Sequence, residues 1–336
     1  MTGLGARERA QSAPGLRGKG IPGMASDPAF QVSGSRMFGI VSLFQARFAA
    51  AVKHLERAVS VSDTLGHGSL AFPTDPRVMC RAFLAWALLC CGHPETALMR
   101  SREALARAYD LSHSFTLAFA LHVSCVFHQL RGDWPELQRL SGALTALAAD
   151  QDFPYFVATG TIFQGWARAA GGETETGLAN MHRGLAAKRA TGVEIKVPYY
   201  LGLVASLCGG AGRVTEALAL LDEALATVSR TGECWFEAEL HRLKGKALLK
   251  AAPEDLSKAE ACYRRAIAVA REQDARHWEL RAATSLARLW CDRGRSAEAG
   301  SDLARVYSWF AEGFDTPDLK AAKALLDALP EAAAPV

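Results

Sequence analysis

A 40-residue repeat is the feature that most constrains the fold of this chain. Each repeat ends a helical pattern with a glycine and continues through a short polar link, and these glycines are Gly92, Gly132, Gly172 and Gly212. Glycine in this place is typical of a helix C-cap in the left-handed backbone conformation, because it has no Cβ atom to clash with the backbone. A fixed period of this length indicates that one supersecondary unit is stacked along the chain.

A second helical pattern begins five residues after each of these glycines. It starts at Ala97-Leu98, Leu137, Gly177-Leu178 and Ala217-Leu218, and continues at Ala259 and Ala299. A longer link around Pro253 alters one step, and Ala51 begins an earlier, less regular unit. Each unit is therefore predicted to be a pair of antiparallel helices, with about seven pairs in the chain.

Small residues in the middle of every first helix support this register, because they allow two helices to cross closely. This column consists of Ala85, Cys125, Gly165, Ala205, Gly245 and Ala287. Thr316-Pro317 resembles an N-cap followed by a first helical residue. The helix pairs are placed near residues 36–66, 75–111, 114–150, 154–191, 196–231, 234–275 and 277–312, and a capping helix over 317–329.

The composition agrees with a helical array, since 50% of the residues are hydrophobic and only 8% are aromatic. The period alone fits tetratricopeptide units with lengthened helices as well as HEAT or armadillo units, and the G-x-x-x-x-A-L pattern favours the first. We therefore predict an all-α fold, an α-solenoid of about seven tetratricopeptide-like helix pairs with a C-terminal capping helix.

Three segments are expected along the chain. Residues 1–35 are rich in glycine and proline and are predicted to be a disordered leader, in which Met24 offers an alternative start, as Met37 does just beyond it. Residues 36–330 are predicted to form the repeat superhelix, and 331–336 a flexible tail.

The net charge and the cysteine pattern constrain the class of partner and the cellular location of the protein. The formal net charge of +3 is too small for a typical nucleic-acid-binding surface. The 8 cysteines include no C-x-x-C pair and mostly lie in apolar stretches, which favours a reduced, cytoplasmic location. No apolar stretch is long enough to span a membrane, and no secretory signal core is present.

Recognisable catalytic motifs are missing from the sequence. There is no phosphate-binding G-x-x-x-x-G-K-[ST] loop, since Gly245-Lys246 lacks the other required residues, and no G-x-S-x-G elbow. His122, Cys125 and His128 share one predicted helix but have no carboxylate to complete a metal site. We expect no enzymatic activity, no cofactor and no metal.

The first helices are expected to line the concave face of the array, and their aromatic and charged residues are the candidate partner-binding groove. One row contains Met79, Phe119, Tyr199, Glu239 and Arg281, and adjacent rows contain His122 with Arg242, and Trp86 with Trp166, Lys246 and Arg288. Such a groove suits a peptide with hydrophobic anchors followed by acidic residues. Packing in the core is the alternative interpretation for Trp86 and Trp166.

Four runs carry a resemblance to a known family: ELRAATSLARLW at 279–290, VYSWFAEGFDTPDL at 306–319, AELHRLKG at 238–245 and SREAL at 101–105. They resemble the C-terminal tetratricopeptide region of bacterial signalling proteins that also carry a class III adenylate or guanylate cyclase domain and an AAA-type ATPase. The resemblance covers roughly 40–329 and implies a regulatory role. The catalytic domains have no counterpart here.

These observations predict a protein-interaction scaffold that binds a peptide or protein in its concave groove. The resemblance implies that a signalling enzyme acting in trans could be the partner. A small-molecule sensor module is the alternative, and it would require a closed, mostly apolar pocket between helix pairs. Binding to nucleic acid is disfavoured by the modest net charge.

Overall fold

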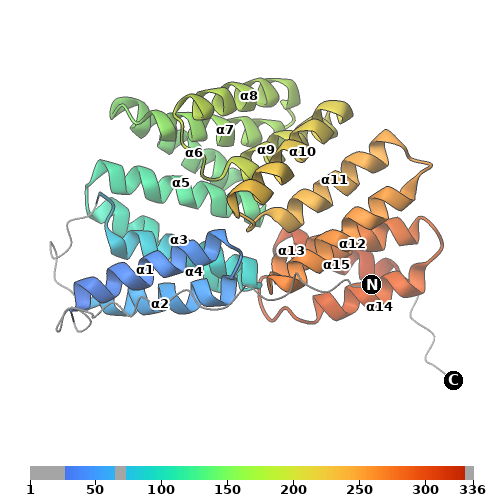
Figure 1. The fold of residues 1–336 in the computed structure, drawn as a ribbon, viewed down its shortest axis with the longest axis horizontal. Helices are drawn as coiled ribbons and strands as arrows, with labels where there is room; N and C mark the ends of the chain where they lie inside the picture. Colours follow the sequence, from blue (N-terminus) through green and yellow to red (C-terminus); the bar gives the residue numbers. More distant parts are fainter. Residues whose placement is uncertain (1–26, 65–72, 330–336) are drawn as a thin grey trace, which may run out of the picture.

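The computed structural model describes residues 27–64 and 73–329, and helices fill almost all of this part (Figure 1). The helices are α1 (Pro28–Phe44), α2 (Phe48–Asp63), α3 (Pro76–Cys91), α4 (Pro94–Asp110), α5 (Ser114–Arg131), α6 (Trp134–Asp150), α7 (Pro154–Ala170), α8 (Thr174–Ala190), α9 (Val197–Gly210), α10 (Val214–Thr231), α11 (Glu237–Ala251), α12 (Leu256–Glu272), α13 (Arg276–Cys291), α14 (Ser296–Tyr307) and α15 (Pro317–Ala328). No strand occurs within the described ranges. The predicted all-α solenoid of helix pairs is confirmed, and α15 is the predicted last helix.

The column of small residues lies where paired helices cross, as the sequence predicted. A Cβ atom added to Gly165 of α7 would lie 2.6 Å from the carbonyl oxygen of Gly177 in α8. A Cβ atom added to Gly245 of α11 would lie 2.7 Å from the ring of Tyr263 in α12. Both distances are too short for a real contact, so these crossings require glycine.

The repeating glycines end the first helices in the predicted way. Gly92 has a φ of 95°, and its N–H group donates to the carbonyl of Leu89 while that of His93 donates to Leu88. This arrangement satisfies carbonyl groups that a helix end otherwise leaves without partners. The other three glycines of the series also have positive φ values.

The first helix begins earlier than predicted. Residues 28–35 were assigned to the leader, but they form the first two turns of α1. Pro28 occupies the first turn, the Asp27 side chain accepts a hydrogen bond from the N–H of Ala29, and Val32 is fully buried. An N-cap followed by proline is a helix-start signal that the glycine-rich composition obscured. Residues 1–26 and 330–336 lie outside the described part.

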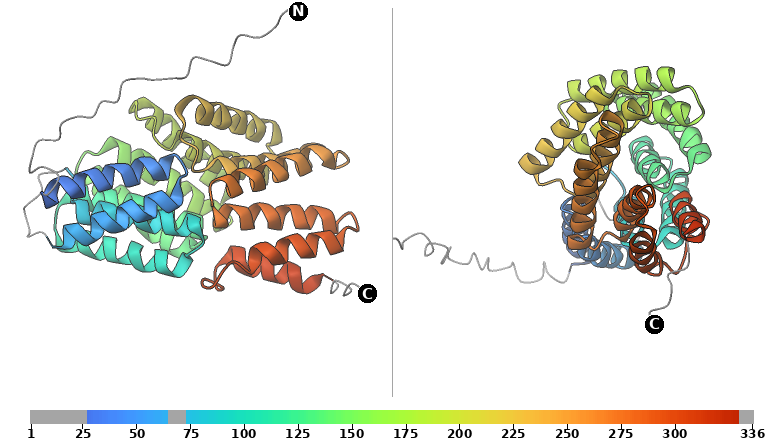
Figure 2. Two further views of the ribbon diagram at one scale, coloured as in Figure 1. Left: turned by 60° about the horizontal axis from the view of Figure 1, so that its bottom comes forward. Right: turned by 90° about the vertical axis from the view of Figure 1, so that its right-hand side faces the viewer.

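The helices form two layers in a strongly curved array. Odd-numbered helices contact one another in succession from α1 to α13 and form the inner layer, whereas even-numbered helices pack outside them. The curvature brings the N-terminal helices beside the C-terminal ones (Figure 1, Figure 2), and α13 contacts α3. Every helix of the described part is too short or too polar to span a lipid bilayer.

The residues after α14 complete this closure. The Glu312 carboxylate accepts hydrogen bonds from the backbone N–H groups of Glu95 and Thr96 at the start of α4. Gly313 lies directly against Pro94, so closely that a Cβ atom there would meet the proline ring at 2.0 Å. The array therefore closes on itself, so that the concave face expected from the sequence is not open along its whole length. The reason is that small rotations between neighbouring units add up over the whole array.

Candidate partner-binding surface

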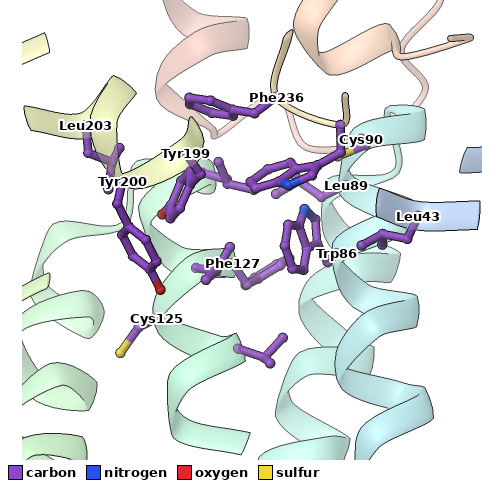
Figure 3. Packing of buried hydrophobic residues seen from close by; sticks show 14 of the residues in the cluster. Leu43, Trp86, Leu89, Cys90, Cys125, Phe127, Tyr199, Tyr200, Leu203 and Phe236 are labelled. Carbon is purple, nitrogen blue, oxygen red and sulfur yellow. The ribbon is translucent and has the colours of Figure 1, made fainter. Parts of the chain in front are cut away.

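Closure buries an aromatic cluster where the ends of the array meet. The ring centroids of Trp86 in α3 and Trp235 before α11 lie 4.3 Å apart. Tyr199 of α9 lies against Trp235 and donates a 2.8 Å hydrogen bond to the Gln129 side chain of α5. Figure 3 shows Trp86 of α3, Tyr199 of α9 and Phe236 of the turn before α11 in this cluster.

Three residues predicted to line the groove are therefore part of the core. Trp86 and Tyr199 are 0% exposed and His122 is 1% exposed. His122 Nδ1 lies 3.1 Å from Thr159 Oγ1, and burial together with the charges of Lys196 and Lys188 keeps its pKa well below the usual value. The prediction that these three side chains are accessible to a partner is wrong, because aromatic residues cover them. Trp235 packs on both Trp86 and Tyr199, and Phe163 of α7 packs on His122.

The other predicted apolar positions are half-buried. Phe119 lies edge to face with Phe83, and Trp166 lies near Trp134. Met79 Sδ accepts a 3.2 Å hydrogen bond from Arg36 of α1. Met79, Phe119 and Trp166 all pack against the main core, so only part of each side chain is open to a partner.

Two histidines that were weighed as metal ligands face different groups. His122 contacts Thr159, whereas His128 Nδ1 lies 3.1 Å from Asp133 Oδ2. They do not form a common site with Cys125.

The basic residues predicted for the C-terminal half of the groove lie together on α11 and α13. Glu239 holds two of them in place. Its carboxylate accepts two 2.7 Å hydrogen bonds from Arg242, and Arg281 contributes a third ion-pair contact at 2.9 Å. Burial would raise the pKa of Glu239, but the two guanidinium groups outweigh burial and lower it to about 2. Glu239 is 3% exposed and orients Arg242 and Arg281 without being open to a partner itself.

Two further cations extend this surface without carboxylate partners. Lys246 of α11 and Arg288 of α13 are exposed, and neither forms an ion pair with any residue in the described ranges. Burial and the neighbouring charges of Arg242 and Lys250 lower the pKa of Lys246. We call Arg242, Lys246, Arg281 and Arg288 the cationic cluster. Its unpaired members can bind carboxylate groups of another molecule.

A second polar cluster, which the sequence did not predict, lies beside the aromatic core. Lys188 is 0% exposed and donates a 2.6 Å hydrogen bond to the carbonyl of Val193. The Lys196 N–H donates to the Glu233 carboxylate at 3.0 Å, and Trp235 Nε1 donates to the same group at 3.0 Å. Burial lowers the pKa of Lys188 and of Lys196 to about 8. Lysines near helix ends usually lie in solvent, so the sequence contained no signal for this cluster.

Two phenol groups adjoin these lysines. The Lys188 ammonium lies 6.0 Å from the ring centroid of Tyr155 and 5.6 Å from that of Tyr200. Burial is the main reason that the pKa of each hydroxyl group is raised, and the two groups also act on each other. Within the described part, neither has a hydrogen-bond partner at ordinary distance. Buried hydroxyl groups without a hydrogen-bond partner are rare, so these two could accommodate an additional polar group.

A separate cleft of about 590 Å³ lies between α3 and α4, outside the cationic cluster. Several arginines line it, but acidic residues already pair with them: Arg81 with Asp63 at 2.5 Å and Arg100 with Glu103 at 2.9 Å. The charges in this cleft are largely compensated, so the cationic cluster is the better candidate for binding an anion.

No protein-family model matches the sequence. An uncharacterised protein of Rhizobium meliloti (strain 1021) is 28% identical over 222 residues, which cover 66% of this chain and 21% of that protein. The chain thus spans about a fifth of the length of this curated relative.

Two solved structures share the fold. The Rap conjugation gene regulator of plasmid pLS20, in complex with the Phr* peptide, superposes with a TM-score of 0.63 at 10% identity, covering 95% of this chain and 82% of that chain. Aspartyl phosphate phosphatase F from Bacillus subtilis gives a TM-score of 0.53 at 12% identity, covering 84% and 70%. These similarities show that the fold is a tetratricopeptide-like helical-repeat solenoid.

Proposed function

We propose that this chain is a non-catalytic regulatory scaffold. Its cationic cluster binds acidic side chains of a partner protein or peptide. One observation carries the proposal. Lys246 and Arg288 are exposed without carboxylate partners among the described residues, next to Arg242 and Arg281, which Glu239 holds in place. Glu239 and Asp318 already pair with Arg242 and Arg281, so the repulsion that a partner's carboxylates would relieve is the one that Lys246 and Arg288 add.

The geometry suits carboxylates better than a diffuse polyanion. Glu239 fixes the guanidinium planes of Arg242 and Arg281, so less side-chain entropy is lost when a ligand binds beside them. Lys246 and Arg288 then supply charges that a partner can pair with directly. Because both are exposed, we expect salt to weaken binding.

The comparisons support this type of function. The Rap regulator is described in complex with a peptide, and it shares the curved repeat fold over most of this chain. The resemblance to the repeat region of cyclase–ATPase signalling proteins suggests that the partner belongs to a signalling enzyme, either in trans or elsewhere in a longer protein. A cytoplasmic setting is part of the same proposal.

The test begins with a displayed peptide library selected on the purified chain, followed by measurement of the Kd of selected peptides by fluorescence anisotropy. In the variant Lys246→Glu/Arg288→Glu, we expect the affinity to fall by at least about tenfold, or about 1.4 kcal/mol. The matched control is Lys258→Glu/Arg305→Glu, whose side chains on the outer helices α12 and α14 are 72% and 56% exposed. Equal loss in both variants, or loss in neither, would contradict the proposed site.

A small-molecule sensor is a second candidate, favoured by the buried hydroxyl groups of Tyr155 and Tyr200, which have no partner in the described part. A ligand with acceptor groups beside Lys188 and Lys196 would satisfy them. A metabolite library screened by thermal shift tests this candidate. A hit that stabilises the parent but not Tyr155→Phe/Tyr200→Phe would support it, whereas a screen without such a hit would count against it.

A further inference from the structure

Three successive helices bring a histidine, a cysteine and a glutamate together away from the cationic cluster. His182 of α8, Cys208 of α9 and Glu216 of α10 each offer one ligand atom, and these atoms all lie within 4.8 Å of one another. His182 Nε2 and Glu216 Oε1 are 3.2 Å apart. No other group of three such residues meets this condition within the ranges that the structure describes.

The local fold explains how these residues meet. Cys208 lies in the last turn of α9, and the tight turn that follows is closed by a 2.9 Å hydrogen bond from the N–H of Arg213 to the Cys208 carbonyl. This turn leads directly into α10 and places Glu216 in its first turn, beside Cys208. His182 projects from the middle of the neighbouring helix α8, so all three ligands stand on rigid elements.

We propose that His182, Cys208 and Glu216 form a zinc-binding site, with water or a group from another molecule as the fourth ligand. In a tetrahedral zinc site, metal–ligand distances of about 2.0–2.3 Å place neighbouring donor atoms about 3.3–3.7 Å apart. The cluster is close to this spacing, so side-chain rotations are enough to complete it. A thiolate and an imidazole favour Zn²⁺ over Mg²⁺ or Ca²⁺, which prefer oxygen ligands.

A metal must displace the proton of the Cys208 thiol, because the thiolate is the form that binds metals. Zn²⁺ binding replaces that proton with a metal–sulfur bond and releases one H⁺ to solvent. The His182 and Glu216 side chains are 38% and 40% exposed, which leaves an entry path for the ion.

The nearby Arg213 does not form a close ion pair with the Glu216 carboxylate. Arg213 lies 4.0 Å from Glu216, but it makes a closer ion pair with Glu175 at 2.5 Å. Glu216 therefore keeps its charge available for a cation. The metal would link α8, α9 and α10 and stabilise the folded state in proportion to its affinity.

The test uses Co²⁺ as a spectroscopic substitute for Zn²⁺. The full chain is treated with a chelator, then titrated with Co²⁺, and Zn²⁺ is added last. We expect visible d–d bands of tetrahedral Co²⁺, a near-ultraviolet sulfur-to-cobalt charge-transfer band from one thiolate, release of one proton per metal, and displacement of Co²⁺ by Zn²⁺.

Three variants and one control locate the site. Cys208→Ser should abolish the charge-transfer band, and His182→Ala and Glu216→Gln should each weaken Co²⁺ binding by more than about tenfold, since even changes around the ligands have effects of that size. Cys262→Ser is the control, because its half-buried thiol on α12 lies outside the cluster. Circular dichroism and thermal unfolding without metal confirm that each variant is folded. Absence of the charge-transfer band in the parent would overturn the proposal, and so would a band that survives in Cys208→Ser or disappears in Cys262→Ser.

Discussion

The indole rings of Trp86 and Trp235 meet edge to face, with centroids 4.3 Å apart and an interplanar angle of 84°. Trp86 comes from α3 near the start of the array and Trp235 from the link before α11, and both are 0% exposed. Their contact joins α3 to the link before α11 across the inside of the superhelix. Closure of the array is therefore supported by apolar packing as well as by polar contacts.

Replacement of Trp86 by alanine tests this packing. We expect Trp86→Ala to lower the free energy of unfolding by about 3–5 kcal/mol, because it removes a large buried side chain and leaves a cavity. Urea denaturation followed by circular dichroism measures the change. Met99→Ala is the control, since Met99 is 50% exposed and should change stability by about 0.5 kcal/mol or less. Similar losses in both variants would show that closure does not depend on the aromatic contact.

Glu312 should stabilise the closed array by capping α4. Its Oε1 atom accepts from the N–H groups of Glu95 at 3.1 Å and Thr96 at 3.0 Å, and its Oε2 atom accepts from Thr96 Oγ1 at 3.0 Å. For Glu312→Ala we expect a loss of about 0.5–2 kcal/mol, as for other N-cap residues, and faster amide hydrogen exchange at Thr96. Glu298→Ala, which removes an exposed partner of Arg295, should leave exchange at Thr96 unchanged.

The buried carboxylate of Glu239 should contribute more to the free energy of unfolding than a carboxylate on the surface does. Glu239→Gln would leave Arg242 without its counter-charge and Arg281 with Asp318 alone at 3.4 Å, and we expect a loss of about 3 kcal/mol in urea denaturation. Glu223→Gln is the comparison, because the Glu223 and Arg189 side chains are 48% and 49% exposed and such pairs contribute about 1 kcal/mol or less. An equal effect at the two positions would contradict the role assigned to Glu239.

Stability should fall as the pH drops from about 6.5 to 4. Burial is the main reason that the pKa of His277 is lowered to about 4, although Asp318 opposes the shift and Arg281, Glu239 and Arg242 also act on the ring. The unfolded chain, with an ordinary histidine pKa of about 6.5, binds a proton in this window that the folded chain does not, so acid favours unfolding.

The measurement is urea denaturation at a series of pH values. His277→Gln should flatten the decline between about pH 6.5 and 4 without removing it, because burial also lowers the pKa of His122 and His128. The contribution of Glu239, whose pKa is about 2, should be lost only at lower pH. An unchanged profile in His277→Gln would argue against a buried neutral histidine at this position.

The sequence by itself determined the local architecture. The spacing of Gly92 and its counterparts predicted the helix pairs, and the small residues at Gly165 and Gly245 predicted their close crossings. These features depend on contacts between residues near one another in the chain, for which the helical period and capping chemistry are sufficient. The N-terminal boundary was misjudged because the Asp27-Pro28 start signal follows a glycine-rich stretch.

Only the tertiary structure decided which residues the superhelix buries. The rotation between neighbouring repeats is small, and its sum over the array determines whether the ends meet, so no single repeat encodes closure. Packing between the helices placed Trp86, His122 and Tyr199 in the core and not in the expected groove. The same folding assembled His182, Cys208 and Glu216 from three helices, because a cluster of side chains from separate helices depends on packing that sequence spacing does not specify.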